Sequence, residues 1–199
     1  IDMDDICVTN INRQLPAMSG TIGKLKTEVM SERVKLINPE CTINIIDDFI
    51  SPENQSDYLN RGYDYVIDAI DNVKTKASLI AYCKRNKINV ITIGGAGGQT
   101  DPTQIQIADL SKTIQDPLLA KVRSDLRKDY NFSQNPKRKF SIDAVFSTQP
   151  LIFPQMTEGC AISATMNCAN GFGAATMITA TFGFFAVSRV IDKLLKKKS

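Results

Sequence analysis

Residues 63–71 read "YDYVIDAID", a largely apolar run that ends in acidic residues. Such a run predicts a parallel strand that is buried on both faces. The segment "KTKASLIAYCKRN" at 74–86 then predicts a helix, and "INVITIGG" at 88–95 predicts a second strand. Strand, helix and strand joined by short links are typical of a doubly wound α/β sheet.

The same alternation extends in both directions along the chain. Apolar residues near helical spacing and the terminator Asn38-Pro39 predict a helix over 25–38. We expect a Rossmann-like, mostly parallel sheet with an antiparallel extension. The remaining expected elements are a strand at 41–49, a helix from the Ser51 cap to Gly62, the antiparallel strand at 99–110, a polar helical stretch with a loop at 111–139, a strand at 141–153 and an apolar helix at 174–187.

Charge is distributed unevenly over the chain. Residues 1–111 carry 11 Lys and Arg against 15 Asp and Glu, residues 112–139 carry 8 against 3, and residues 189–199 carry 5 against 1. We therefore predict an α/β core at 1–110, a basic insertion at 111–140, and a C-terminal region of strand, loop, apolar helix and basic tail at 141–199. A protein that binds a polyanion on one face has such a pattern.

Two residue counts exclude classes of chemistry. The chain has no His, which rules out an imidazole base. Its five cysteines form no CxxC pair, so neither a Cys-rich zinc site nor a disulfide framework is expected. Unpaired cysteines favour a reducing compartment, and we expect a cytoplasmic protein. The 174–187 helix is too short to span a bilayer and is expected to be buried; contact of the basic tail with a membrane surface is the alternative.

Ligands of a doubly wound sheet bind at the carboxyl ends of its strands. Asp2 and Asp4 end one apparent strand, and an acidic residue in that position typically binds ribose hydroxyls, a role that we assign to Asp2. Asn10 and Arg13, three residues apart, can grip phosphate oxygens from one helical turn, and Lys26 supplies a second cation. Each of these residues taken alone would be interpreted as solvated surface.

Asp71 and Asn72 directly follow the strand at 63–71. A carboxylate at this point suits Mg²⁺, which prefers one or two carboxylates together with phosphate and water. The segment "GGAGG" at 94–98 lacks the third glycine of the dinucleotide fingerprint and is not followed by a helix, so we interpret it as tight backbone near the site. Since Asp2 stands at the second position, we expect the glycine-rich first β-α unit of the pocket to lie upstream of the sequence given.

The motifs "DMDD", "NINRQ", "GKLK", "INPE" and "DAIDN" together resemble those of the ubiquitin-activating-enzyme-like adenylyltransferases, which include the molybdopterin-synthase and sulfur-carrier adenylyltransferases. The long stretches "GGAGGQTDPTQIQIADLSKTIQDPL" and "NCANGFGAATMITATFGFFAVS" are similar to the branch of this family that dehydrates threonylcarbamoyladenosine in bacterial tRNA. The resemblance covers residues 1 to about 190.

This resemblance implies an enzyme that uses ATP and Mg²⁺ to adenylate the threonyl carboxylate, after which ring closure releases AMP. It implies that Arg13, Lys26 and Asp71 are catalytic, and that Asp71 holds the metal through ATP. It also implies a homodimer that works beside a cysteine desulfurase and its sulfur-acceptor protein. The implied ATP-binding residues are Asp2, Asn10, Arg13, Gln14, Lys26, Asp71 and Asn72.

Two further hypotheses concern the basic segment and the cysteines. Seven basic residues favour contact with the tRNA backbone over a merely solvated face: Lys121, Arg123, Arg127, Lys128, Lys137, Arg138 and Lys139. Cys168 is either a thiol that accepts sulfur or an acyl group, or a small buried residue. The segment between Cys160 and Cys168 is shorter than in the similar proteins, so a loop is expected to be missing from it.

Two other functions compete with tRNA dehydration. One is activation of the C-terminus of a ubiquitin-like sulfur-carrier protein, which the basic segment and the absence of CxxC pairs argue against. The other is a non-catalytic scaffold in a sulfur-relay complex that retains a nucleotide-binding fold.

Overall fold

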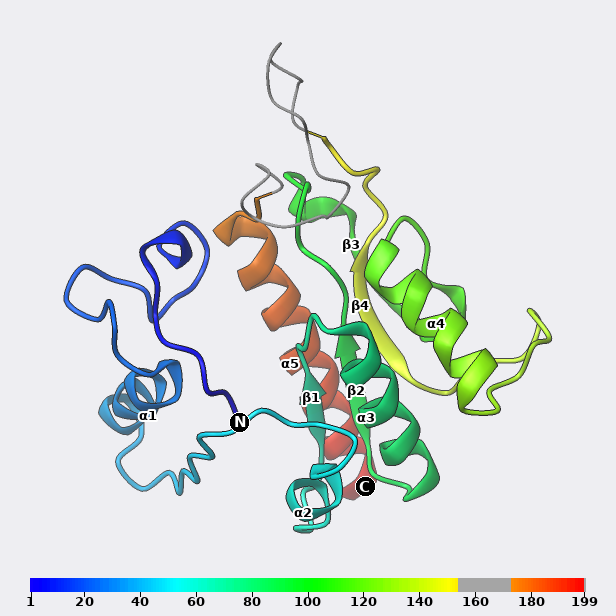
Figure 1. The fold of residues 1–199 in the computed structure, drawn as a ribbon, viewed down its shortest axis with the longest axis horizontal. Coiled ribbons are helices and arrows are strands. Elements are labelled where there is room, and N and C mark those ends of the chain that lie inside the picture. The colour runs from blue at the N-terminus through cyan, green and yellow to red at the C-terminus, as the bar shows by residue number, and fades with distance from the viewer. Residues whose placement is uncertain (154–172, 199) are drawn as a thin grey trace.

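The computed structural model describes residues 1–153 and 173–198. Its four-stranded sheet has the order β1-β2-β4-β3 (Figure 1). β1, β2 and β4 are parallel, and β3 is antiparallel to β4. The expected mostly parallel sheet with an antiparallel extension is therefore confirmed. The strands are β1 (Val66–Asp68), β2 (Val90–Ile93), β3 (Ile105–Asp109) and β4 (Asp143–Ser147).

Side-chain caps define where the helices beside the sheet begin. Asn72 Oδ1 accepts the Thr75 N–H at the start of α3, and Asp116 Oδ1 accepts the Leu119 N–H at the start of α4. Pro117 occupies the first turn of α4, where its missing N–H has no cost. The helices are η1 (Val8–Asn10), α1 (Lys26–Ile37), α2 (Gln55–Leu59), α3 (Val73–Arg85), η2 (Pro102–Gln104), η3 (Leu110–Lys112), α4 (Pro117–Asp129) and α5 (Thr176–Lys198).

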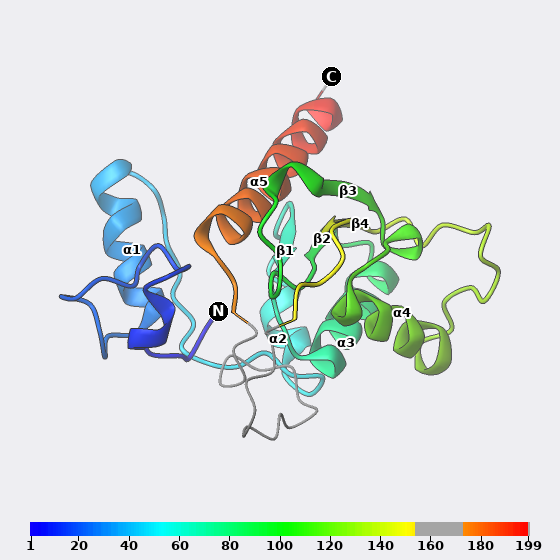
Figure 2. The same ribbon diagram turned by 90° about the horizontal axis from the view of Figure 1, so that it is seen from above.

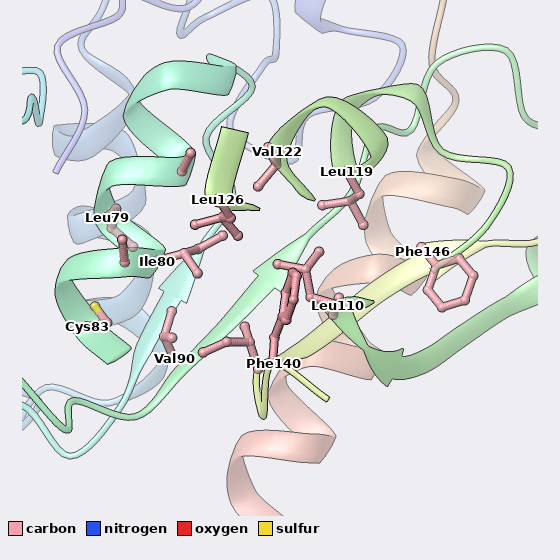
Figure 3. Packing of buried hydrophobic residues seen from close by; sticks show 14 of the residues in the cluster. Leu79, Ile80, Cys83, Val90, Leu110, Leu119, Val122, Leu126, Phe140 and Phe146 are labelled. Carbon is pink, nitrogen blue, oxygen red and sulfur yellow. The ribbon is translucent and has the colours of Figure 1, made fainter. Parts of the chain in front are cut away.

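The sheet lies between two helical layers. α3 and α4 cover one face and α5 covers the other (Figure 2). The core on the α3 and α4 side includes Ile80, Leu119 and Leu126, which are buried against residues of the sheet (Figure 3). Burial of these side chains supplies the main driving force for packing both helices on the sheet.

α5 packs on the sheet with one of its faces. Ile178, Phe182, Ala186 and Val190, each four residues apart, are buried, whereas Phe184 is 74% exposed. The expectation of a buried apolar helix is thus right for only one face of α5. The helix also continues into the basic tail. Among the residues that the structure describes, no helix has the length and apolarity needed to cross a membrane.

Two expected strands are wrong. Residues 41–49 are extended but belong to no sheet, and residues 1–5 form only an isolated bridge between Asp5 and Leu25. One backbone bond, from Asp2 N to Ile46 O at 3.3 Å, joins the two segments. A single bond does not make the ladder that defines a strand, and both segments lie beside the sheet with α1 (Figure 1).

Candidate active site

The N-terminal group of expected site residues is held by local contacts. Lys26 Nζ lies 2.6 Å from Asp4 Oδ2, and Asp2 Oδ1 accepts the Asp4 N–H at 2.9 Å. Lys26 is the first residue of α1, and its own N–H donates to Asp4 O. The structure therefore brings Asp2, Asp4 and Lys26 together, and it places them outside the sheet.

Asn10, Arg13 and Gln14 form one tight turn after η1. The N–H groups of Arg13 and Gln14 both donate to Asn10 O, at 3.0 and 2.9 Å. Buried Asn10 uses its side-chain oxygen to cap the turn at the Cys7 N–H. Arg13 Nη1 donates to Thr9 O at 2.7 Å and to Asn12 Oδ1 at 3.1 Å.

This turn is anchored to the first turns of α5. Asn12 Nδ2 donates to Ala174 O, and the hydroxyls of Thr176 and Thr179 donate to the carbonyls of Asn12 and Arg13. Residues more than 160 positions apart in the chain are thus joined by three hydrogen bonds. The stretch "AATMITAT" therefore supports Arg13, a role that sequence patterns could not assign to it.

Asp71 follows the carboxyl end of β1 and is exposed. Asn72 beside it caps α3, so its side-chain oxygen is already occupied. A single exposed carboxylate at a strand end fits the coordination that Mg²⁺ prefers, in which phosphates and water complete the shell. Among the described residues, no cluster of three or more possible metal ligands occurs.

The two groups are not in contact. Across residues 1–153 and 173–198, no hydrogen bond or ion pair connects Asp71 or Asn72 with residues 1–40. The common ATP pocket that the sequence predicts therefore stays a prediction. Arg13 lies in the N-terminal turn, Lys26 lies at the start of α1 with Asp4 as its partner, and Asp71 follows β1.

A buried ion pair behind Asp71 was not predicted. Lys76 Nζ lies 3.0 Å from Asp68 Oδ2, and both side chains have no exposed surface. Lys76 also donates to Ile70 O at 2.7 Å, while Asp68 accepts from Ile70 N–H and from the Thr92 hydroxyl. Burial lowers the pKa of the Lys76 ammonium, and Asp68 opposes that shift. These bonds hold the turn between β1 and Asp71 in one conformation.

Asp116 hydrogen-bonds to the backbone of the glycine turn that follows β2. Its two carboxylate oxygens accept the N–H groups of Gly95 and Leu119, at 3.0 and 2.8 Å. A Cβ on Gly94 would stand 1.9 Å from Asp116 Oδ2, so only glycine fits there. Burial raises the pKa of Asp116, and the two N–H donors counteract this. The interpretation of "GGAGG" as tight backbone is confirmed at Gly94, whereas a Cβ on Gly95 would make ordinary contacts, 3.7 Å from Leu118 Cβ.

The basic residues expected to contact tRNA divide into two kinds. Arg123 donates to the Thr113 hydroxyl, and the Arg127 guanidinium lies 5.2 Å from the centre of the Phe140 ring. Both arginines are half-buried and contribute to packing, which the sequence could not reveal. The others are exposed: Lys121, Lys128, Lys137, Arg138 and Lys139.

The cysteines described by the structure are all free thiols. Cys7 is exposed, whereas Cys83 is buried in α3, and this burial, with Asp68 nearby, raises the Cys83 pKa to about 12. Such a thiol is unreactive at neutral pH. Cys160 and Cys168, with the loop expected between them, lie outside the described residues.

The family follows from comparison with known proteins. The chain belongs to the ThiF family, whose model matches residues 1–199. Over 199 residues it is 98% identical to the tRNA threonylcarbamoyladenosine dehydratase of Haemophilus influenzae, covering all of this chain and 76% of that protein. The resemblance drawn from the sequence motifs is therefore confirmed.

Two crystal structures of the Escherichia coli tRNA N6-threonylcarbamoyladenosine dehydratase, TcdA, share the fold. The complex with ATP has a TM-score of 0.88 and 54% sequence identity, over 99% of this chain and 74% of that one. The complex with AMP has the same TM-score and identity, over 99% of this chain and 75% of that one. The α/β class and the nucleotide-binding character of the fold agree with the sequence-based expectation.

Proposed function

We propose that this chain dehydrates threonylcarbamoyladenosine in tRNA to its cyclic form, at the expense of ATP. The observation that carries the proposal is its close likeness to an enzyme of that name that was crystallised with both ATP and AMP. ATP is the expected substrate of an adenylation, and AMP is its final product. The 98% identity to a second dehydratase supports the same activity.

The chemistry proceeds in two steps. The threonyl carboxylate attacks the α-phosphate of ATP and displaces pyrophosphate, which gives an acyl-adenylate. A nucleophile within the same modified nucleoside then attacks the activated carbonyl, and AMP leaves with one carboxylate oxygen. A free carboxylate is a poor electrophile, so activation is required, while ring closure requires no protein nucleophile. A chain without His suits this sequence of steps.

Within this scheme each half of the site has a separate task. Asp2 would bind ribose, Asn10, Arg13 and Lys26 would contact the phosphates, and Gln14 would support the same loop. Asp71, with Asn72 at its side, would hold Mg²⁺ through ATP, and the metal would supply positive charge that stabilises the phosphates. The rigid turn behind Asp71 supports this task because a positioned ligand loses little entropy on binding.

The wider setting is inferred from charge and from the family. The α/β core at 1–110 binds ATP, the basic insertion at 111–140 contacts tRNA, and the part at 141–199 supports the core. We infer a homodimer that acts with a cysteine desulfurase and its sulfur-acceptor protein. A cytoplasmic location, with peripheral membrane contact of the basic tail as the alternative, agrees with three free thiols.

ATP–pyrophosphate exchange tests the function against both of its competitors. We expect exchange that depends on tRNA carrying threonylcarbamoyladenosine and that is absent with unmodified transcript. Exchange that requires a ubiquitin-like sulfur-carrier protein instead would contradict the proposal. The scaffold function is favoured if neither the modified tRNA nor the sulfur-carrier protein elicits exchange or ATP binding, while the chain still binds a cysteine desulfurase.

A further inference from the structure

A large cavity lies at the end of the sheet opposite to Asp71. We name it the amino-edge cavity, because Tyr65, Val90 and Asp143, which line it, stand at the amino ends of β1, β2 and β4. Its volume is about 870 Å³. Its lining includes none of the residues expected to bind ATP. The cavity is therefore separate from the candidate active site.

Positive charge dominates the lining of this cavity. Its two carboxylates are those of Asp109 and Asp143, which leaves an excess of four positive charges over the whole lining. The basic side chains come from α3, α5 and the segments that follow α3 and α4, so four separate parts of the chain contribute. The six are Lys84, Lys87, Lys139, Arg189, Lys193 and Lys196.

The two carboxylates of the lining leave three of its exposed lysines unpaired. Asp109 accepts three backbone N–H groups, from residues 111, 140 and 141, at 3.0, 2.9 and 2.7 Å. Asp143 binds the Arg189 guanidinium at 2.8 Å and lies 4.0 Å from Lys193 Nζ. Lys84, Lys87 and Lys139 are exposed, and none has a hydrogen bond or ion pair within the described part of the chain. Three cations thus face the cavity without a partner.

The geometry suits an extended polyanion better than a small phosphate. α3 and α5 bring their C-terminal ends to the cavity, and both helices run toward the lower end of the molecule in Figure 1. Helix C-termini carry partial negative charge, so no backbone N–H cradle for a compact anion exists there. Lysine is a mobile point charge, which suits successive phosphates along a backbone.

A second cavity lengthens the basic surface. It has a volume of about 390 Å³ and shares Lys84 and Lys139 with the amino-edge cavity. It adds Arg85 and Tyr130, whose guanidinium and ring centre are 5.8 Å apart. Basic side chains interspersed with aromatic rings are typical of RNA-binding surfaces.

We propose that the amino-edge cavity binds the ribose-phosphate backbone of the tRNA substrate. The proposal rests on the proposed function, and it places the main contact at Lys84, Lys87 and Lys139 in place of α4.

Two triple variants of equal charge test the location. The first is Lys84→Gln, Lys87→Gln and Lys139→Gln. The matched control is Lys121→Gln, Lys128→Gln and Lys137→Gln, which removes three exposed lysines of the surface expected from the sequence. tRNA binding is measured by fluorescence anisotropy from 50 to 200 mM salt, a range over which phosphate contacts change affinity strongly. ATP binding is measured in parallel.

We expect the first triple to weaken tRNA binding about 10- to 100-fold at fixed salt and to reduce the salt slope by about 2 to 3. Its ATP binding is expected to stay unchanged, and the control triple is expected to weaken tRNA binding less than the first triple does. Equal binding by the first triple and the parent, or a loss confined to the control triple, overturns the proposal. The proposal is also overturned if the first triple loses binding to anionic phosphatidylserine vesicles while its tRNA binding stays intact.

Failure of this proposal is distinguishable from failure of the proposed function. If the parent chain cyclises modified tRNA but the first triple binds tRNA normally, only the cavity proposal is wrong. If the parent chain binds tRNA through the cavity but never consumes ATP with it, the proposed function is wrong and the cavity proposal stands.

Discussion

Lys76 Nζ and Asp68 Oδ2 form an ion pair of 3.0 Å in which both side chains are fully buried. The pair joins α3 to the end of β1, three residues before Asp71. A buried pair does not by itself stabilise a fold greatly, because both charges lose their hydration. Removing one partner is costly, however, since it leaves the other charge buried and uncompensated. The relationship therefore makes Lys76 a structural support of the candidate metal site.

We predict that Lys76→Met lowers the free energy of unfolding by about 3–5 kcal/mol. The double variant Asp68→Asn, Lys76→Met should recover part of that loss, because no buried charge is left unpaired. Lys74→Met, at an exposed position of the same helix, should change stability by less than about 0.5 kcal/mol. Urea unfolding followed by circular dichroism measures all three. A Lys76→Met chain as stable as the parent would show that the pair contributes little.

Gly94→Ala should destabilise the chain by about 1–3 kcal/mol, as overpacking does in tightly packed sites. The added Cβ would lie 1.9 Å from Asp116 Oδ2, and that carboxylate is held by two N–H donors. Gly20→Ala is the matched control, because nothing lies within 4 Å of its added Cβ. Thermal unfolding of the two variants compares them directly. Equal melting temperatures would contradict the close contact at Gly94.

Asp71→Asn should reduce tRNA-dependent ATP–pyrophosphate exchange by roughly 100-fold, since it removes one preorganised charge from the site. Stability should not change, because the side chain is exposed and bonds to no described residue. Asp64→Asn, an exposed acid before β1, is expected to exchange like the parent. Raising the Mg²⁺ concentration should restore part of the Asp71→Asn rate. Full exchange activity in Asp71→Asn would show that Asp71 does not belong to the active site.

Asp109→Asn should destabilise the chain at neutral pH by about 1–3 kcal/mol, as for other hydrogen bonds to a charged group. Burial acts to raise the pKa of Asp109, but hydrogen bonds involving Ser111, Phe140 and Ser141 outweigh it and hold the pKa below 3.8. A lowered native pKa gives stability that is present above the unfolded pKa and is lost as pH falls through the native one. The difference between variant and parent should therefore shrink below about pH 4.

Denaturant unfolding at pH 7, 5, 4 and 3 checks this dependence. Asp64→Asn again serves as the control, since its exposed carboxylate bonds to no described group. A difference between Asp109→Asn and the parent that stays constant from pH 7 to 3 would contradict the assignment of the three N–H donors to an ionised carboxylate.

The alternating order of the elements could be predicted because each signal is local. The apolar run at 63–71, the helix at 74–86 and the alternating strand at 99–110 correspond to β1, α3 and β3. The observed bounds of these elements differ by a few residues from the expected ones, because a strand ends where no neighbouring strand pairs with it. The strand expected at 41–49 failed because a pattern of side chains cannot supply the neighbouring backbone that a ladder requires.

The supporting residues of the candidate site could not be predicted because they depend on tertiary contacts. Lys76 looks like an ordinary surface lysine in "KTKASL", yet it is fully buried against Asp68. Asp116 caps α4 with one oxygen, and its second oxygen accepts the Gly95 N–H, which is 21 residues away. The amino-edge cavity likewise gathers lysines from segments whose proximity only the fold establishes.

The most direct test is conversion of the nucleoside itself. tRNA carrying threonylcarbamoyladenosine is incubated with the chain, ATP and Mg²⁺, and its nucleosides are analysed by mass spectrometry. We predict ATP-dependent formation of the cyclic nucleoside, lighter by one water, with one AMP released per nucleoside converted and with little conversion by Asp71→Asn. A nucleoside that stays unchanged while the chain binds both ATP and tRNA would contradict the proposed function.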